Sequence, residues 1–452
     1  MPTCAFWINY ASVYLLLKGV AGTLLGLVLL PMFQDTFGVT SVEYQQYALV
    51  VMLPWSMKPL AAMIADGTGS PQALVVILAI AGAVSAFQLG HAASVNAAIA
   101  YAFVCSMQIA FTDIMAEGEY AYTLKHLGSE AEKKRTISIV WGLMFVGQLA
   151  ASIVSGFVDA ATCLLMACPL LLQTGIVTTA NRMFIGRKRQ LWPAGVVVCI
   201  ALTLAAAGMV PVTLLSTMNG KIAYVLVCSL VLLVVAARML PWPLAKANMY
   251  MFASSALYLP INGAMDYFAT VSTQCIPGGP ALDMQFYISS GAIVSSIAAG
   301  VAVLLFNTGT RGWSYRAMFW VGTAVRCSAS LADIVFVKRW NVQAGISDKV
   351  MYLVGDAAVQ TMAATLDTMP MVMLTASLCS EGSESTTYAI LAAFQNFGFA
   401  VATTLGAALQ TALDVHLHDG KPCTYDYLPQ LILLAHTALP LLTIPLTFLL
   451  ID

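Results

Sequence analysis

Charged residues are scarce in this sequence. Only 9% of its 452 residues are Asp, Glu, Lys or Arg, whereas soluble domains contain about 25%. Hydrophobic residues make up 60% of the chain, and the mean hydropathy is +0.84. A water-soluble fold could not hide this much apolar surface, so the composition excludes an ordinary soluble domain and indicates an integral membrane protein. The net charge of −1 gives no reason to expect a nucleic-acid partner.

Several kinds of chemical site are missing as well. The ten cysteines include no Cys-x-x-Cys pair, the histidines are not clustered, and no His-Glu-x-x-His segment or Ser/His/Asp arrangement is present. We therefore expect neither an enzyme nor a bound metal or cofactor. The first residues lack the cationic region and the cleavage site of a signal peptide, so we expect the first apolar stretch to be retained as a span.

Long apolar runs dominate what is present. A helix needs about 20 mostly apolar residues to cross the hydrocarbon core, because every backbone amide must be bonded within the segment. The sequence predicts about fourteen such spans, near residues 11–32, 42–64, 72–92, 94–116, 136–158, 161–181, 193–216, 221–241, 247–270, 284–306, 313–337, 350–375, 385–411 and 428–450. The seventh and eighth could instead form one re-entrant pair.

The placement of lysine and arginine orients these spans. With the N-terminus in the cytosol, most Lys and Arg residues of the connecting loops fall on the cytosolic side, which indicates that both termini are cytosolic. The outer loop at 338–349 fits least well, because it opens with Lys338 and Arg339.

The span count also suggests a domain plan. We expect an all-α integral membrane fold with a six-helix bundle at 1–181, a basic linker and two inserted helices at 182–246, and a second six-helix bundle at 247–452. Two six-helix bundles with an extra pair between them are typical of a major-facilitator-type solute carrier. No sequence repeat between the halves supports this symmetry, which is inferred from the span count.

Ionisable residues inside the spans are the best functional candidates, since a charge at mid-bilayer costs at least roughly 2.5–3.5 kcal/mol. In a major-facilitator arrangement, the first and fourth helices of each bundle line the central cavity. Six ionisable residues fall on these helices: Lys18, Asp113, Glu117, Asp266, Asp356 and Asp367. The pattern predicts that charged side chains from both bundles meet in a shared water-filled cavity.

These candidates also have structural interpretations. Asp113 and Glu117 share a helix face near one membrane surface, where they could cap the helix or pair with the basic 125–135 loop. Lys18 and Asp266 lie deeper, and could form a buried salt bridge between the bundles.

Other charged residues fit structural roles better. Arg326 and Asp333 lie seven residues apart on one helix face, and we expect them to form an ion pair. Lys58 is within snorkelling reach of the inner membrane surface. His436, in the last span, fits a packed histidine better than a proton relay.

Five segments in order along the chain resemble the folate–biopterin transporter family, a branch of the major facilitator superfamily, and are most similar to its kinetoplastid pteridine transporters. They are LPWSMKPLAAMIAD at 53–66, FTDIMAEGEYA at 111–121, LPINGAMDYFAT and CIPGGP within 259–280, RWNVQAGISDKVMYLVGDA at 339–357, and MPMVMLTASLC with GSESTTYAILAAFQNFG, ending at 398. The resemblance implies proton-coupled uptake of folates, pterins or a related metabolite.

The resemblance also directs attention to gating and structural positions. It adds Lys58, Asp66, Glu384 and Asn396 to the candidates named above. The loop after Asp66, GTGSPQ, lacks the basic residues usual in the family, and Ser380-Glu381 replaces a usual Pro-Lys. These departures leave open a different cargo, such as S-adenosylmethionine or another nucleoside- or amino-acid-like solute. They also leave open a sensor that binds its ligand without transporting it.

The chemistry of a pterin suggests roles for some candidates. A carboxylate can accept both N–H groups of the 2-aminopyrimidinone edge, a role that fits Asp266 or Asp113. Lys18 could pair with the glutamate tail of a folate. Tyr267 could stack on the flat ring, or could equally serve packing. Reversible protonation of a buried aspartate would couple transport to protons.

Two cysteines are expected to pair. Cys275 and Cys423 both fall in predicted outer loops, on the oxidising side of a plasma-membrane protein, so we predict a disulfide between them. We expect a monomer whose partners are a small-molecule substrate and the lipid bilayer.

Overall fold

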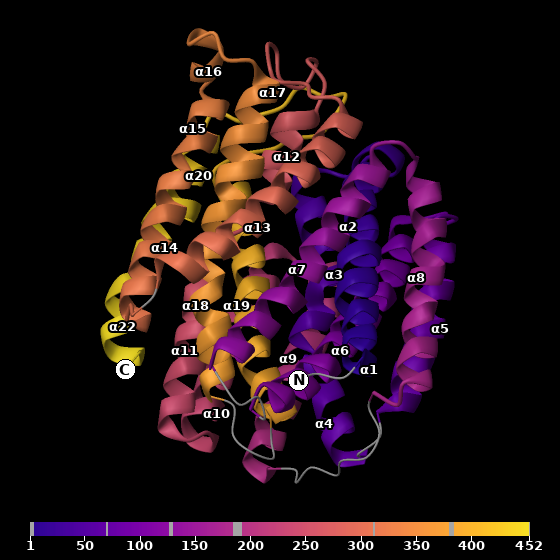
Figure 1. Cartoon of the computed structure of the whole chain (residues 1–452). Helices are drawn as coiled ribbons and strands as arrows, with labels where there is room; N and C mark the ends of the chain where they lie inside the picture. The colour runs from indigo at the N-terminus through magenta and orange to yellow at the C-terminus, as the bar shows by residue number, and fades with distance from the viewer. Residues whose placement is uncertain are drawn as a thin grey trace.

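The computed structural model describes residues 4–68, 71–125, 130–183, 192–310, 312–378 and 384–451. In these ranges the chain is almost entirely helical and has no β-strand, only an isolated bridge between His416 and Thr424. The prediction of an all-α fold is confirmed. The N-terminus and the C-terminus lie at the same end of the bundle (Figure 1), which we call the termini end.

Some helices of the first half are short segments that join into long columns, and others are long and continuous; segments labelled η have π-helical hydrogen bonding. They are α1 (Cys4–Tyr10), η1 (Ala11–Ala21), α2 (Gly22–Pro31), η2 (Met32–Thr36), α3 (Ser41–Ser56), α4 (Lys58–Thr68), α5 (Gln72–Leu89), α6 (Val95–Lys125), α7 (Glu130–Ser155) and α8 (Ala160–Ala180). Two helices follow, α9 (Pro193–Leu215) and α10 (Met218–Met239).

The second half is built in the same way. Its helices are α11 (Trp242–Ala256), α12 (Asn262–Thr270), η3 (Phe286–Ser290), α13 (Gly291–Gly309), α14 (Tyr315–Ala329), α15 (Leu331–Val337), α16 (Trp340–Gln343), α17 (Asp348–Met351), η4 (Tyr352–Gln360), α18 (Thr361–Leu378), α19 (Glu384–Ala412), α20 (Leu428–Leu433), η5 (Leu434–Ala438), α21 (Leu439–Leu441) and α22 (Thr443–Leu450).

Twelve helical columns in the described residues are long and apolar enough to cross a membrane by length and composition. The chain is therefore an integral, multi-pass membrane protein. The two other predicted spans are also helical, but they are not among the twelve. The column α11–α12 is broken between Ala256 and Asn262, and the other is α17–η4–α18. The predicted count of fourteen spans is thus not confirmed by length and composition.

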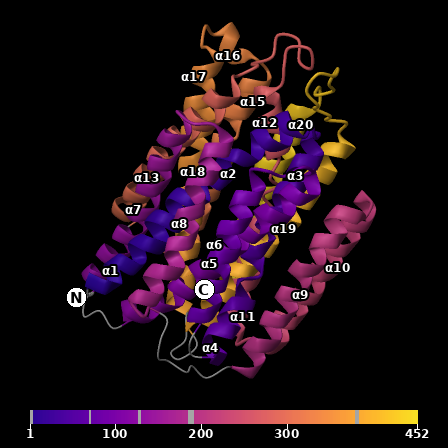
Figure 2. The ribbon, with the colours of Figure 1, turned by 90° about the vertical axis from the view of Figure 1, so that its right-hand side faces the viewer.

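The α9–α10 pair lies at the side of the molecule as an antiparallel hairpin (Figure 2). It packs on α3 from the first half and on α11 and α19 from the second. The two halves also pack directly on each other, through α3 against α19 and α7 against α13. Helices distant in sequence therefore form the interface between the halves.

Glycines bring η1 and α7 unusually close. A Cβ on Gly147 would lie 2.3 Å from the carbonyl oxygen of Leu15, and one on Gly19 would lie 2.8 Å from that of Met144. Small residues at such a crossing allow two backbones to pack in direct contact. Gly19 makes this crossing, whereas a Cβ on Gly26, further along the same column, would meet nothing within 4 Å.

The end opposite the termini, which carries α12, α16 and α17, is closed by hydrogen bonds between the halves (Figure 1). Gln45, buried in α3, donates to the carbonyl oxygens of Pro260 at 2.9 Å and Thr403 at 3.0 Å. Its own Oε1 accepts from the backbone N–H of Gly263 at 3.3 Å. Gln45 therefore joins α3 to both α12 and α19, at the point where Pro260 interrupts the α11–α12 column.

The loops at this end, which we call the disulfide end, are covalently joined. Cys275, between α12 and η3, forms a disulfide with Cys423, between α19 and α20, and their Cα atoms are 4.9 Å apart. This is the pair proposed from the loop positions. Asp419 reinforces the connection by accepting from the backbone N–H of Ser272 at 2.8 Å. Burial raises the pKa of Asp419, but the hydrogen bonds from Ser272 and Gly420 and the nearby His418 together hold the pKa below its usual value.

The disulfide gives a direct prediction. Titration of the denatured protein with a thiol reagent will detect two more reactive thiols after reduction than before it, because Cys275 and Cys423 become free. The variant C275S/C423S will show no such increase, and mass spectrometry of a non-reduced digest will find the two cysteine peptides linked. Equal thiol counts before and after reduction would contradict the pairing.

Candidate functional site

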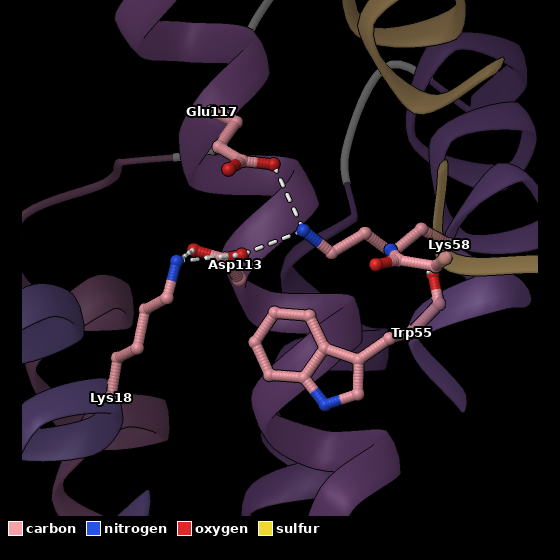
Figure 3. Close-up of polar contacts among 6 residues, drawn as sticks. Lys18, Trp55, Lys58, Asp113 and Glu117 are labelled. Carbon is pink, nitrogen blue, oxygen red and sulfur yellow. Dashed lines mark hydrogen bonds and ion pairs between the residues drawn. The ribbon is translucent and has the colours of Figure 1, made fainter. Parts of the chain in front are cut away.

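Two lysines and two carboxylates form a network inside the first half (Figure 3). Lys18 comes from η1, Lys58 from α4, and Asp113 and Glu117 from α6. Nζ of Lys18 lies 3.0 Å from Oδ1 of Asp113, and Nζ of Lys58 lies 2.7 Å from Oδ2. Lys58 also reaches Oε2 of Glu117 at 3.0 Å. Positive and negative groups alternate along this chain, so the network is neutral as a whole.

The network is nearly dry, and Lys18 is its most accessible member. The exposed fraction of the side chain is 0% for Asp113, 4% for Lys58, 9% for Glu117 and 15% for Lys18. Moving one ion into such a site costs several kcal/mol, which the close ion pairs offset. Asp113 and Glu117 are one turn apart on α6, and this spacing lets Lys58 bond both.

Aromatic rings surround the two ammonium groups. Nζ of Lys18 lies 5.3 Å from the ring centre of Tyr14, 5.5 Å from that of Trp55 and 5.6 Å from that of Trp141. Nζ of Lys58 lies 4.8 Å from the ring centre of Trp55. The electron-rich faces of these rings stabilise positive charge where little water is present.

A cavity of about 270 Å³ opens beside this network, and all of its lining residues come from the first half. Lys18 is the charged side chain in its wall, Trp55 supplies a flat aromatic surface, and Gln148 and Ser106 supply polar groups. The hydroxyl of Ser106 is buried and has no hydrogen-bond partner in the structure. The cavity thus offers a cation and a ring for stacking, which suits a flat molecule with a negative group.

This geometry corrects three structural interpretations made from the sequence. Lys58 does not snorkel to the membrane surface, because it is buried and bonded to both carboxylates. Asp113 and Glu117 pair with Lys18 and Lys58 rather than only capping α6 or serving the basic 125–135 loop. The alternative of a Lys18 salt bridge between the halves is also wrong, since its partner lies in the same half.

The predicted ion pair between Arg326 and Asp333 is wrong. Arg326 on α14 bonds Asp367 on α18 instead, with 2.8 Å between Nη1 and Oδ2. Its guanidinium carbon lies 3.4 Å from the ring centre of Tyr258. Asp333 accepts from the side-chain amide of Gln360 at 2.7 Å. The helix is interrupted at Ser330, between α14 and α15. Residues seven apart across this interruption therefore need not lie on one helix face.

The remaining cavity candidates of the second half lie apart from Lys18. Asp266 accepts from the hydroxyl of Tyr287 at 2.8 Å. Asp356, on η4, is near enough to Asp266 for the two carboxylates to interact. Tyr267 is fully buried and donates to the carbonyl oxygen of Val39 at 2.8 Å, so its ring packs and has no free face for a ligand.

The ion pairs that the cavity candidates form in the described residues do not join the two bundles. The ion pairs of Lys18, Lys58 and Arg326 each stay within one half. Asp113 and Asp266, the two carboxylates considered for a pterin edge, are bonded to lysines and to a tyrosine respectively.

Two of the gating candidates connect the halves. Asp66 on α4 accepts from the hydroxyl of Thr386 on α19 at 2.6 Å. Asn396 on α19 donates to the carbonyl oxygen of Trp55 at 3.0 Å. The side chain of Glu384 lies outside the described part of the structure.

Reasoning from the sequence missed several residues of these sites. Trp55 was within a quoted motif, and its spacing of three from Lys58 could have identified it. Gln45, Tyr258 and Tyr287 carried no signal, because a polar or aromatic residue in a span is common and its contacts are not local. In the described residues, no group of three or more His, Cys, Asp or Glu side chains is placed to hold a metal ion.

Comparison with known proteins agrees with this architecture. The sequence model of the BT1 family matches residues 18–452. The probable folate-biopterin transporter 6 of Arabidopsis thaliana is 29% identical over 174 residues, which is 38% of this chain and 33% of that protein. The match to this curated relative thus spans about a third of its length.

Solved structures show the same fold at low sequence identity. A peptide transporter of the POT family, crystallised with sulfate, has a TM-score of 0.68 and 12% identity, with 99% of this chain and 93% of that chain covered. The human organic anion transporter MFSD10 has a TM-score of 0.60 and 12% identity, with 99% of this chain and all of that chain covered. These likenesses confirm the major-facilitator-type architecture.

Proposed function

Since the chain belongs to the BT1 family, which matches it over residues 18–452, we propose that it is a secondary active transporter of a folate- or pterin-type metabolite. We propose that it works by alternating access and is coupled to protons. The relatives that match it are named folate-biopterin transporters, which supports this cargo class. The observation that carries the proposal is the cavity beside Lys18, with its stacking surface and its partly exposed cation.

The arrangement of the network explains how Lys18 could take up a cargo carboxylate. Asp113 is shared between the two lysines, and it keeps Lys58 as a partner if Lys18 turns away. A carboxylate entering the cavity can therefore replace Asp113 at Lys18 without leaving a buried charge unpaired. The flat ring of the same molecule can stack on Trp55, which lines the cavity. Lys18 is in this view the cargo-binding cation, and Lys58 stays structural.

The expected cytosolic termini and the disulfide at the opposite end support one orientation in the membrane. We propose that the termini end faces the cytosol and the disulfide end faces the outside of the plasma membrane. Arg339, which opened the poorly fitting outer loop, is bonded by both oxygens of Asp348 at 2.6 and 2.7 Å. This pairing fixes the position of the Arg339 side chain, and the orientation rests on the larger number of Lys and Arg residues in the other loops.

Replacing Lys18 by methionine tests the cargo site. We expect K18M to bind folate roughly 10- to 100-fold more weakly, because a hydrogen bond to a charged group contributes about 1.5–3 kcal/mol. Binding of biopterin, which has no carboxylate, will change much less. The measurements are equilibrium binding and uptake of radiolabelled folate and biopterin with purified protein in proteoliposomes.

A lysine outside the cavity is the matched control. Lys349 lies beside the ring of Phe286 at the disulfide end, so K349M will bind and transport like the parent protein. Equal loss of folate and biopterin binding in K18M would contradict the carboxylate role. Absence of uptake of both compounds by the parent protein would overturn the proposed function, and tight binding without uptake would identify a sensor.

A further inference from the structure

A second polar cluster lies in the second half, away from the Lys18 cavity. His436 on η5 and Asp333 on α15 are both buried, with exposed side-chain fractions of 8% and 5%. Nδ1 of His436 lies 3.9 Å from Oδ2 of Asp333 and has no hydrogen-bond partner. The cluster is therefore polar, enclosed and incompletely bonded.

The tautomer of His436 follows from its other nitrogen. Nε2 lies 3.1 Å from the carbonyl oxygen of Leu259, and a carbonyl oxygen can only accept, so Nε2 carries the hydrogen. In the neutral ring Nδ1 is then an acceptor. It faces the carboxylate of Asp333, which is also an acceptor when ionised. Two acceptors face each other, and a single proton between them would turn the contact into a hydrogen bond.

The neighbouring groups determine whether that proton binds to His436 or to Asp333. The ionisable groups that face the pair from neighbouring elements are Arg326 and Cys327 on α14, Asp356 on η4, Asp367 on α18, and Tyr258 in the break between α11 and α12. The ring of His436 stacks on the ring of Tyr258, with centres 4.5 Å apart. The guanidinium of Arg326 also lies over the Tyr258 ring. An imidazolium would repel Arg326, whereas a carboxylic acid at Asp333 would relieve repulsion with Asp356.

We propose that Asp333 and His436 form a proton-binding pair that controls the break between α11 and α12. The proton binds to Asp333, which then donates to Nδ1 of His436. Closing the present 3.9 Å to hydrogen-bond length moves the ring toward α15 by about 1 Å.

The backbone carries this movement to the break. Leu259 accepts from Nε2 of His436 and also donates to the carbonyl oxygen of Ala435 at 3.3 Å. A shift of His436 therefore pulls on Leu259, which lies next to Pro260 in the break. Pro260 in turn accepts from Gln45, one of the contacts that close the disulfide end. The pair is thus connected through two hydrogen bonds to the closure between the halves.

The pair gives the proposed proton coupling a site, and in that respect it rests on the proposed function. The test needs no cargo, however, and can succeed or fail independently of folate uptake. The purified full-length protein in nanodiscs is titrated from about pH 8 to about pH 5 and followed by infrared spectroscopy. This range covers the pH values at which histidine side chains usually change protonation. We expect a band from a protonated carboxylic acid that is lost in D333N. D159N is the matched control and will keep the band. Asp159 is an exposed carboxylate that caps the N-terminus of α8, and asparagine is an equally good N-cap residue.

Hydrogen exchange at residues 257–262, corrected for its intrinsic pH dependence, measures the effect on the break. The parent protein and D159N will exchange differently at the two ends of the pH range. D333N and H436F will show no such difference, and H436F provides a second variant should D333N fail to fold. Retention of the parent's infrared band in D333N, or of its exchange response in H436F, would overturn the proposal.

Discussion

Replacing Asp113 by asparagine will destabilise the protein by about 3–5 kcal/mol, the usual cost of removing one partner from a buried ion pair. Asp113 is fully buried and is bonded to both Lys18 and Lys58. Without it, two ammonium groups share Glu117 as the remaining carboxylate of the network. The measurement is thermal unfolding of purified protein in detergent, together with the yield of monodisperse protein.

A double variant distinguishes the effect of an unbalanced buried charge from a general folding defect. In D113N/K58Q one cation and one anion are removed together, and Lys18 stays next to the cavity, where water can reach it. We expect the double variant to unfold at a higher temperature than D113N alone. Two buried charges in one network are strongly coupled, so the effects will not add. A double variant less stable than D113N, or a D113N protein as stable as the parent, would refute the role of the network.

Replacing Gly263 by alanine will hold the disulfide end open and abolish transport. A Cβ on Gly263 would lie 2.1 Å from the carbonyl oxygen of Ser41, a backbone atom of the other half that cannot turn aside. The closed state cannot form without separating α12 from α3. Uptake in proteoliposomes will fall to background, while cargo binding from the open side persists.

A second measurement reports on the closure itself. Ala402 is fully buried in α19 and belongs to the same apolar cluster as Leu30 of the first half. A cysteine introduced there will react with a membrane-impermeant maleimide in the G263A background and stay protected in the parent. Gly300 provides the matched control for the G263A variant, since a Cβ on Gly300 would meet nothing within 4 Å. G300A will transport normally, and alanine in place of a helical glycine adds roughly 0.5–1 kcal/mol of stability. Normal uptake by G263A would refute the close contact.

The sequence was sufficient to predict the helices, because apolar length is a local property. It also identified Lys18, Asp113 and Glu117 as members of a site, since the cost of burying a charge marks such residues wherever they pack. Their partners could not be predicted. The pairing depends on how far each helix is rotated about its axis, and this is set by distant contacts such as the crossing of Gly19 and Gly147.

Two errors came from treating spans as continuous helices. The depth assigned to Lys58 assumed an uninterrupted helix, but α3 ends before Met57 and α4 begins at Lys58, where the side chain meets α6. The helix containing Arg326 and Asp333 is likewise interrupted at Ser330. His436 was interpreted as a packed residue. It is indeed buried, but its contact with Asp333 depends on the position of another helix and left no mark in the sequence.

The disulfide between Cys275 and Cys423 joins two loops that belong to the same half of the molecule. A covalent bond across the two halves would prevent them from separating and would end the transport cycle. The Cys275–Cys423 disulfide lies entirely within the second half, so it restrains two loops of that half without tying the halves together. If the disulfide end faces an oxidising compartment, as we propose, these two loops are strengthened there while the two halves stay free to separate.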